Sequence, residues 1–187
     1  MEKPLETKKM IATTRMFGKN VTELNDIKEA IATYTTRAAE KLRRQNSAAS
    51  VISIFVVAKE ESHSANFHGA TISAYTTLPA ATSITNELIA PAMLLVEQIF
   101  KQGCDYKKAG VLLSGLVPDT SIQSNLFAPP SENNKRFLMN AVDNLNFSMR
   151  DDVVKFASSG LNRDWKMRRE LRSARYTSRW EELKEVG

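Results

Sequence analysis

Side chains that could carry out catalysis or hold a metal are few in this sequence, and they are widely spaced. Cys104, the single cysteine, lies far along the chain from His63 and His68, so neither a zinc site nor a Cys/His nucleophile pair is predicted. Asp151 and Asp152 fit a solvated turn better than a metal site. No glycine-rich phosphate loop and no HExxH motif occurs. The sequence therefore predicts no catalytic residue, no metal site and no cofactor in this chain.

A short segment at residues 123–127, QSNLF, is the clearest candidate binding motif. Leu126 and Phe127 stand in a polar, proline-bounded stretch, and such exposed apolar anchors fill a pocket on a partner while Gln123 fixes the register. The alternative is that Leu126 and Phe127 fold back onto the neighbouring domain as a hydrophobic latch. The five residues alone do not decide between these two interpretations.

The charge balance indicates an anionic partner. Lys and Arg number 26 against 21 Asp and Glu, which gives a formal net charge of +5. An excess of this size favours a polyanion where the cations are clustered. The tail 163–179 is one such cluster, with seven cations against two acids.

The composition predicts a protein of a reducing, aqueous compartment. The chain has 187 residues, 42% of them apolar, which is enough for one ordinary domain or two small ones. A single cysteine excludes an internal disulfide framework. The charged N-terminus has no apolar region typical of a signal peptide, and no apolar run reaches the roughly 18 residues of a membrane span. We expect a cytoplasmic location and no membrane partner.

Hydrophobic periodicity predicts a first unit of strands and helices. A turn is expected at residues 18–20. Thr22 is a candidate N-cap and Gly103 a candidate C-cap, while Pro91 predicts a bend or a late start in the second helix. The predicted elements are, in order, strand 8–17, a helix after Thr22 that ends at Arg44, strand 50–59, strand 68–77, helix 84–102 and strand 107–116.

The order of these elements predicts an α+β fold, a two-layer sandwich in which two helices cover one face of a four-stranded sheet. In strand 68–77 the residues alternate, so that Ala70, Ile72 and Ala74 are expected to face the core. The hydroxyl-bearing residues between them are expected on the opposite face, namely Thr71, Ser73, Tyr75 and Thr77.

The sequence changes in character after Pro118. A linker is predicted first, then a short helix that carries apolar residues between Phe137 and Leu145, then a strand at 153–156 and the basic tail. The tail contains Trp165 and Trp180, for which packing is a better interpretation than stacking on bases.

Five short motifs together resemble the C-terminal third of the UmuC branch of the Y-family translesion DNA polymerases. The resemblance extends from Lys8 to Val186. The motifs are TRMFG at 14–18, AAEKLR at 38–43, YKKAGV at 106–111, WKMRR at 165–169 and RYTSRW at 175–180.

The resemblance implies a division of the chain and a set of binding residues. Residues 1–8 would be a linker, 9–118 a little finger DNA-binding domain, 119–130 a linker with the clamp-binding peptide, and 131–187 a C-terminal segment. The sheet face away from the helices would hold the template–primer backbone. The implied DNA-binding residues are Lys9, Thr13, Arg15, Lys19, Ser73, Tyr75, Thr77, Lys107 and Lys108; the implied clamp-binding residues are Gln123, Leu126 and Phe127.

The same resemblance implies an SOS-response DNA repair polymerase and its partners. These would be template–primer DNA, the sliding clamp, and for the tail cations either DNA, a UmuD-like subunit or the RecA filament. The Mg²⁺ ions of nucleotidyl transfer would be held by palm carboxylates upstream of this segment, so this piece alone would not polymerise DNA. Met1 would then be an engineered start. The alternative is a stand-alone, non-enzymatic scaffold protein that uses the same fold to bind protein partners.

Overall fold

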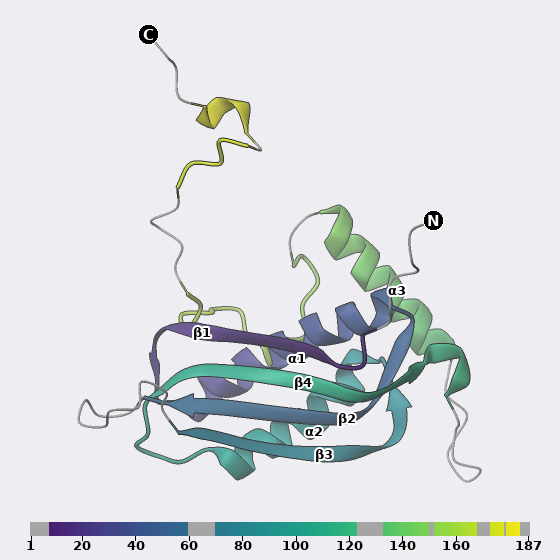
Figure 1. Cartoon of the computed structure of the whole chain (residues 1–187), viewed down its shortest axis with the longest axis horizontal. Helices are drawn as coiled ribbons and strands as arrows, with labels where there is room; N and C mark the ends of the chain where they lie inside the picture. Colours follow the sequence, from purple (N-terminus) through teal and green to yellow (C-terminus); the bar gives the residue numbers. More distant parts are fainter. Residues whose placement is uncertain are drawn as a thin grey trace.

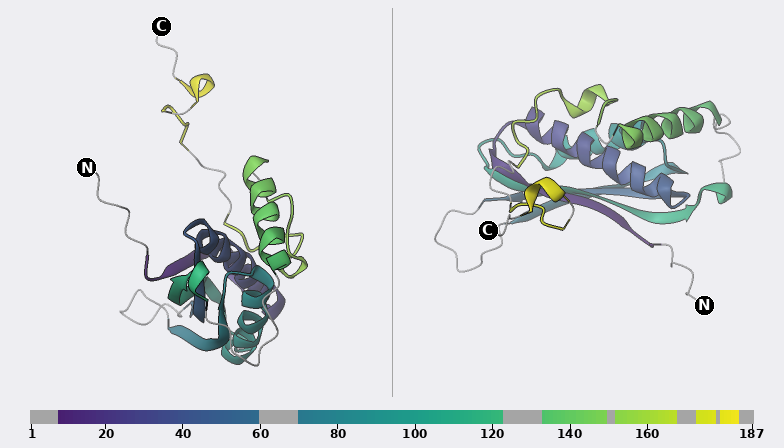
Figure 2. Two further views of the ribbon diagram at one scale, coloured as in Figure 1. Left: turned by 90° about the vertical axis from the view of Figure 1, so that its right-hand side faces the viewer. Right: turned by 90° about the horizontal axis from the view of Figure 1, so that it is seen from above.

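The chain folds as an antiparallel four-stranded sheet with helices packed on one face (Figures 1 and 2). This computed structural model describes residues 8–59, 70–122, 133–149, 152–167, 173–177 and 179–183. The main elements are β1 (Ile11–Val21), α1 (Leu24–Arg44), β2 (Ser47–Ala58), β3 (Thr71–Thr82), α2 (Thr85–Ile99), β4 (Tyr106–Pro118) and α3 (Asn133–Ser148).

The strands lie in the order β1-β4-β2-β3, which places β1 and β3 at the two edges. Helices α1 and α2 cover the same face of this sheet, and no helix of the described residues covers the other face (Figure 2). The predicted β-α-β-β-α-β sandwich is confirmed.

The hydrophobic core lies between the sheet and helices α1 and α2. Ile52 and Ile54 of β2 are fully buried there because alternate residues of a strand point to the same face. Ile27 and Ile31 of α1, four residues apart and so on one side of the helix, are buried against them, as is Leu88 of α2.

The first strand continues through the turn that the sequence predicted. β1 extends to Val21, so the turn expected at residues 18–20 is wrong. Its pairing with β4 shifts between Met16 and Val21, which means that the glycine-containing stretch forms an irregular part of the strand. The prediction of Thr22 as the N-cap is also wrong. Helix α1 begins at Leu24 with Glu23 in the N-cap position, and no side-chain capping hydrogen bond forms there.

The second helix is shorter than predicted at its C-terminal end. α2 ends at Ile99 with Phe100 as its C-cap, so Gly103 is not the cap. Gly103 instead adopts a φ of 83° in the connection to β4, a conformation that glycine reaches without steric cost. Pro91 lies inside the helix, and because the helix begins at Thr85, the predicted late start does not occur.

The described residues of the C-terminal part form a helix where one was expected, but no strand. The helix is α3, whereas the strand predicted at 153–156 is wrong. The Val154 backbone N–H donates to Asn146 Oδ1 at 2.9 Å and the Asn146 side-chain amide donates to Val154 O at 3.0 Å. These bonds occupy the backbone groups of Val154 that a neighbouring strand would need. Among the described residues, no helix has the length and apolar character needed to span a membrane.

Candidate nucleic-acid interface

The register of the sheet decides which side chains face the helices. Ile54 of β2 pairs with Val111 of β4, and Val111 pairs with Thr13 of β1. All three are buried, so this row lies under the helices. Because the side chains of a strand alternate, the residues next to them in sequence lie on the uncovered side.

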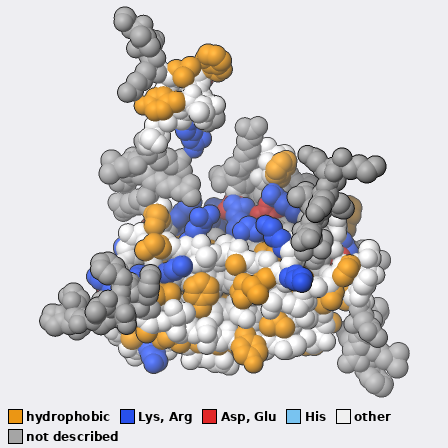
Figure 3. All heavy atoms as spheres, in the orientation of Figure 1, with side chains coloured by type: hydrophobic (Ala, Val, Ile, Leu, Met, Phe, Trp, Pro, Cys, Tyr) orange, Lys and Arg blue, Asp and Glu red, His pale blue; other side chains and the backbone are white. Residues whose placement is uncertain are grey.

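We call that uncovered side the open face. Figure 3 shows it with apolar side chains scattered singly among polar and backbone atoms, while many of the Lys and Arg side chains gather toward the β1 edge. By the register of the strands, the open face consists of Ala12, Thr14 and Met16 on β1; Lys108, Gly110, Leu112 and Ser114 on β4; Val51, Ser53, Phe55 and Val57 on β2; and Thr71, Ser73, Tyr75 and Thr77 on β3.

The middle of the open face is built around Phe55 and Gly110, which are cross-strand partners. A Cβ on Gly110 would lie 2.5 Å from the Phe55 ring and 2.9 Å from the Thr14 Cβ, so only glycine allows this arrangement without a shift. Lys108 lies above the same ring, with its Nζ 6.0 Å from the centroid, within reach of a cation–π interaction. A cation is thereby fixed on an otherwise hydroxyl-rich and apolar surface.

Four of the nine predicted DNA-binding residues lie on the open face. Ser73, Tyr75 and Thr77 point outward from β3, as the alternation predicted, and Tyr75 is 73% exposed. Lys108 is the fourth. Hydroxyl, phenol and ammonium donors therefore share one surface, and this donor set suits phosphate oxygens.

The remaining candidates lie elsewhere. Thr13 is only 8% exposed on the helix side of β1, where its hydroxyl accepts a hydrogen bond from Lys41 Nζ at 3.3 Å. Grouping Thr13 with the open face is therefore wrong, because the strand alternation turns it inward. Arg15 has the same parity but is exposed at the sheet edge. Lys9 and Lys19 are exposed near the two ends of β1, and Lys107 lies at the register shift between β4 and β2.

The predicted clamp-binding residues Gln123, Leu126 and Phe127 lie outside the residues that the structure describes. The described range that precedes them ends at Ile122, after β4 and a short 3-10 turn. Clamp binding by this segment stays a prediction.

The C-terminal segment packs onto the sandwich, which the sequence left undecided. Trp165 is 3% exposed, and its ring meets Phe17 and Tyr34 edge-on with centroids 6.2 and 5.8 Å away. Packing is thereby confirmed for Trp165, but Trp180 is 85% exposed and does not pack. The Gly18 backbone N–H donates to Trp165 O at 2.9 Å, and a Cβ on Gly18 would lie 2.5 Å from Lys166 O. A glycine here lets the segment reach the β1 edge.

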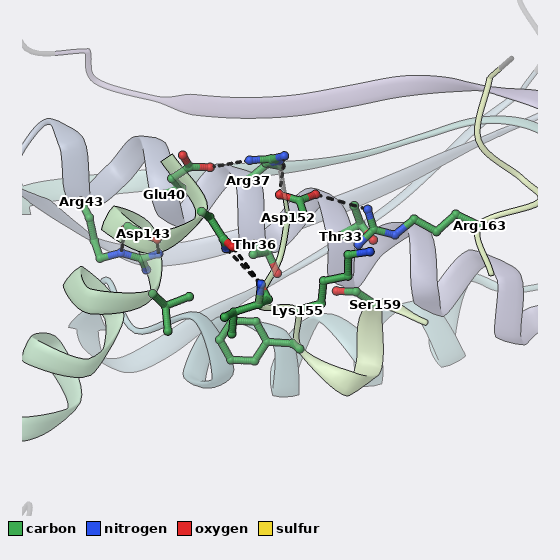
Figure 4. Close-up of a pocket in the computed structure, with 14 residues that line it drawn as sticks. Thr33, Thr36, Arg37, Glu40, Arg43, Asp143, Asp152, Lys155, Ser159 and Arg163 are labelled. Atoms are coloured by element: carbon green, nitrogen blue, oxygen red, sulfur yellow. Dashed lines mark hydrogen bonds and ion pairs between the residues drawn. The ribbon is translucent and has the colours of Figure 1, made fainter. Parts of the chain in front are cut away.

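Ion pairs join the same segment to α1 (Figure 4). Arg37 Nη2 lies 2.6 Å from Asp152 Oδ1, and Arg163 Nη1 lies 3.4 Å from the other oxygen of that carboxylate. Further along α1, Arg43 donates to both Asp143 oxygens, at 2.6 and 2.8 Å. Asp152, expected in a solvated turn, therefore joins α1 to the tail. A clue in the sequence was the excess of Lys and Arg over Asp and Glu in α1.

Burial and positive charge perturb two groups near the β1 edge. Burial raises the pKa of Tyr34 to about 12, although the nearby Arg15 guanidinium acts in the opposite direction. Burial lowers the pKa of Lys41, and the charges of Arg15 and Lys8 lower it further. Cations are thus concentrated at this edge. Within the described ranges, no three His, Cys, Asp or Glu side chains are grouped so that they could hold a metal.

Comparisons with known proteins match nearly the whole chain to one group of relatives. The family model described as the impB/mucB/samB family C-terminal domain matches residues 8–126, and a domain of unknown function, DUF4113, matches residues 136–186. UmuC of Salmonella typhimurium strain LT2 is 33% identical over 189 residues, covering 100% of this chain and 44% of UmuC. SamB of Salmonella typhimurium is 31% identical over 185 residues, covering 98% of this chain and 43% of SamB.

One solved structure with a similar segment is the insertion ternary complex of the Dbh DNA polymerase. It has 14% sequence identity and a TM-score of 0.49, and the match covers 63% of this chain and 32% of that chain. The present chain spans less than half the length of the curated relatives that it matches.

Proposed function

This chain belongs to the impB/mucB/samB family, whose C-terminal domain model matches residues 8–126, and UmuC is among its relatives. From that premise we propose that the chain is the DNA-holding and clamp-tethering region of an error-prone Y-family translesion DNA polymerase. In this proposal the open face holds the backbone of the template–primer duplex. Nucleotidyl transfer, with Mg²⁺ on palm carboxylates, belongs to another domain of the whole protein.

The observation that carries the proposal is the uncovered sheet face. A sheet that packs helices on one side leaves the other in water, and here that side presents Ser73, Tyr75, Thr77 and Lys108. Hydroxyl and ammonium groups donate to phosphate oxygens whatever the base sequence. A surface of this kind binds duplex DNA with little sequence preference, as lesion bypass requires.

We further propose that residues 123–127 tether the protein to a sliding clamp. Gln123, Leu126 and Phe127 follow β4 and its short 3-10 turn directly. A tether raises the effective concentration of the DNA-holding domain at a primer end, which compensates for a weak intrinsic grip. A role in the SOS response, a cytoplasmic location, and contacts of the tail with a UmuD-like subunit or a RecA filament belong to the same proposal.

DNA binding by the open face is tested by fluorescence anisotropy of the full chain with a blunt DNA duplex over a range of salt concentrations. Wild-type affinity is expected to fall steeply with salt, and Lys108→Ala to reduce the slope by about 0.9, because one phosphate is then no longer neutralised. Lys101→Ala, an exposed cation after α2, is the matched control and is expected to leave the slope unchanged. A wild-type affinity that does not depend on salt would contradict DNA holding by this chain.

The clamp part is tested by surface plasmon resonance on an immobilised bacterial sliding clamp. The triple variant Gln123→Ala, Leu126→Ala, Phe127→Ala is expected to abolish binding, because it removes both apolar anchors and the register residue. Ser124→Ala with Asn125→Ala changes the same segment and should retain it. Equal affinity of the triple variant and the wild type would remove the tether from the proposal.

A further inference from the structure

A groove of about 620 Å³ lies along the outer edge of β1, between that strand, α1 and the docked C-terminal segment. Its walls come from two separately matched regions, since Arg15 and Lys41 lie within residues 8–126 and Arg163 and Lys166 within residues 136–186. The groove therefore exists only where the C-terminal segment packs on the sandwich.

The charge of the groove is strongly positive. Among the described residues that line it, the one carboxylate is that of Asp152, which lies between Arg37 and Arg163. The described lining has six cations, namely Arg15, Arg37, Lys41, Lys108, Arg163 and Lys166.

Two of these cations, Arg15 and Lys166, are exposed, and within the described part of the chain their side chains make neither an ion pair nor a hydrogen bond. Lys41 is exposed too, but its ammonium donates to Ala12 O and Thr13 Oγ1. The charges of Arg15 and Lys166 are therefore available for a ligand. Burial lowers the pKa of Lys41, and the nearby charge of Arg15 lowers it further, because two cations that line the same groove repel each other. An anionic ligand would relieve that repulsion.

The accessible polar groups of the groove are donors. They are the guanidinium and ammonium groups of its cations, which only donate hydrogen bonds. The chemistry of the site therefore favours a ligand rich in acceptor oxygens along its length.

From these observations we infer that the groove binds the phosphodiester backbone of single-stranded DNA that leaves the duplex on the open face. The inference rests on the proposed function. Met16 and Lys108 are cross-strand partners on the open face, and both also line the groove, so the two surfaces are continuous across β1. A DNA strand that leaves the duplex at this edge meets the groove directly, whereas an acidic peptide would have to be supplied by a second protein.

The test compares the wild type with the double variant Arg15→Ala, Lys166→Ala, using anisotropy of the full chain. The probes are a blunt duplex, the same duplex with a single-stranded template overhang, and an oligothymidylate. Because two phosphates of the single strand are then no longer neutralised, the salt slope is expected to fall by about 1.4 and overhang and oligothymidylate binding to weaken roughly tenfold at about 0.15 M salt. Affinity for the blunt duplex should fall much less, because Lys108 and the rest of the open face still hold it.

Two controls separate charge from structure. Lys101→Ala with Lys135→Ala removes two exposed cations outside the groove and should bind all three probes as the wild type does. Arg15→Lys with Lys166→Arg keeps both charges and should retain overhang binding. Circular dichroism and thermal unfolding of each variant report whether it folds.

Three results would overturn the inference, and they can be distinguished. If the double variant binds the overhang and oligothymidylate like the wild type while Lys108→Ala still weakens duplex binding, the groove is not a strand site and the proposed function stands. If the wild type binds no probe in a salt-dependent way, the proposed function fails and the inference fails with it. If a polyglutamate peptide, and not oligothymidylate, binds through Arg15 and Lys166, the groove is a site for acidic peptides.

Discussion

The indole ring of Trp165 lies edge-on to the phenol ring of Tyr34, with centroids 5.8 Å apart and planes at 85°. This contact joins the middle of α1 to a residue well beyond the last strand of the sheet. It makes the C-terminal segment part of the hydrophobic core, in which Trp165 packs together with Phe17 and Tyr34.

Trp165→Ala is expected to destabilise the protein by about 3–5 kcal/mol, because it removes a buried aromatic side chain and leaves a cavity. Urea unfolding followed by circular dichroism measures the change. Trp180→Ala is the matched control, since its exposed ring loses little on truncation. Equal stability of the two variants would show that Trp165 does not hold the segment in the core.

Gly110→Ala is expected to cost about 1–3 kcal/mol, because the new methyl group meets the Phe55 ring and the Thr14 Cβ. Adding Phe55→Ala should recover part of that cost, since the ring is the closer obstacle. Unfolding of the two single variants and the double variant measures the coupling free energy. A coupling of zero would mean that the open face accommodates the methyl group without moving Phe55.

Arg43→Ala is expected to destabilise the protein by about 3 kcal/mol. The Arg43 side chain is buried, and besides Asp143 it donates to Ser83 O at 2.7 Å and Thr85 Oγ1 at 2.9 Å, so its loss leaves several acceptors unpaired. Lys28→Ala, the control, removes a cation of the same helix that is paired with Glu97 of α2 and should cost no more than about 1 kcal/mol. Limited proteolysis should cut near α3 faster in Arg43→Ala alone, and equal rates in both variants would contradict a role of Arg43 in holding α3.

The unfolding free energy should fall in alkaline solution through Tyr34. Its pKa rises from 10.0 in the unfolded chain to about 12 in the fold, so folding favours the neutral phenol. The contribution is complete below pH 10.0 and is lost as the pH rises toward 12, by about 2–3 kcal/mol. Urea unfolding at a series of pH values measures this loss.

Tyr34→Phe is the control for that titration. It removes the buried hydroxyl, which has no partner among the described residues, and should leave stability near neutral pH unchanged or slightly higher. The alkaline loss should become smaller but not vanish, because burial also raises the pKa of Tyr106. An unchanged pH dependence in Tyr34→Phe would contradict the assignment of the titration to Tyr34.

The sequence predicted the sandwich and one face of it correctly because both depend on local periodicity. Hydroxyl residues occupy every second position of β3 and therefore share one face of the strand. Because the apolar residues between them must face the core, Ser73, Tyr75 and Thr77 point away from it. The ends of elements were less predictable. The glycine at residue 18 was interpreted as a turn, although its role is to admit the docked tail.

The sequence by itself determined the order of strands and helices, the alternation along β3 and the family resemblance, since each is written in neighbouring residues. Only the tertiary structure decided that Thr13 faces the helices, that Trp165 enters the core and that Asp152 lies between Arg37 and Arg163. These facts depend on contacts between residues far apart in the chain. Such contacts follow from the register of β1 and β4 and from the docking of the tail, neither of which a local pattern specifies.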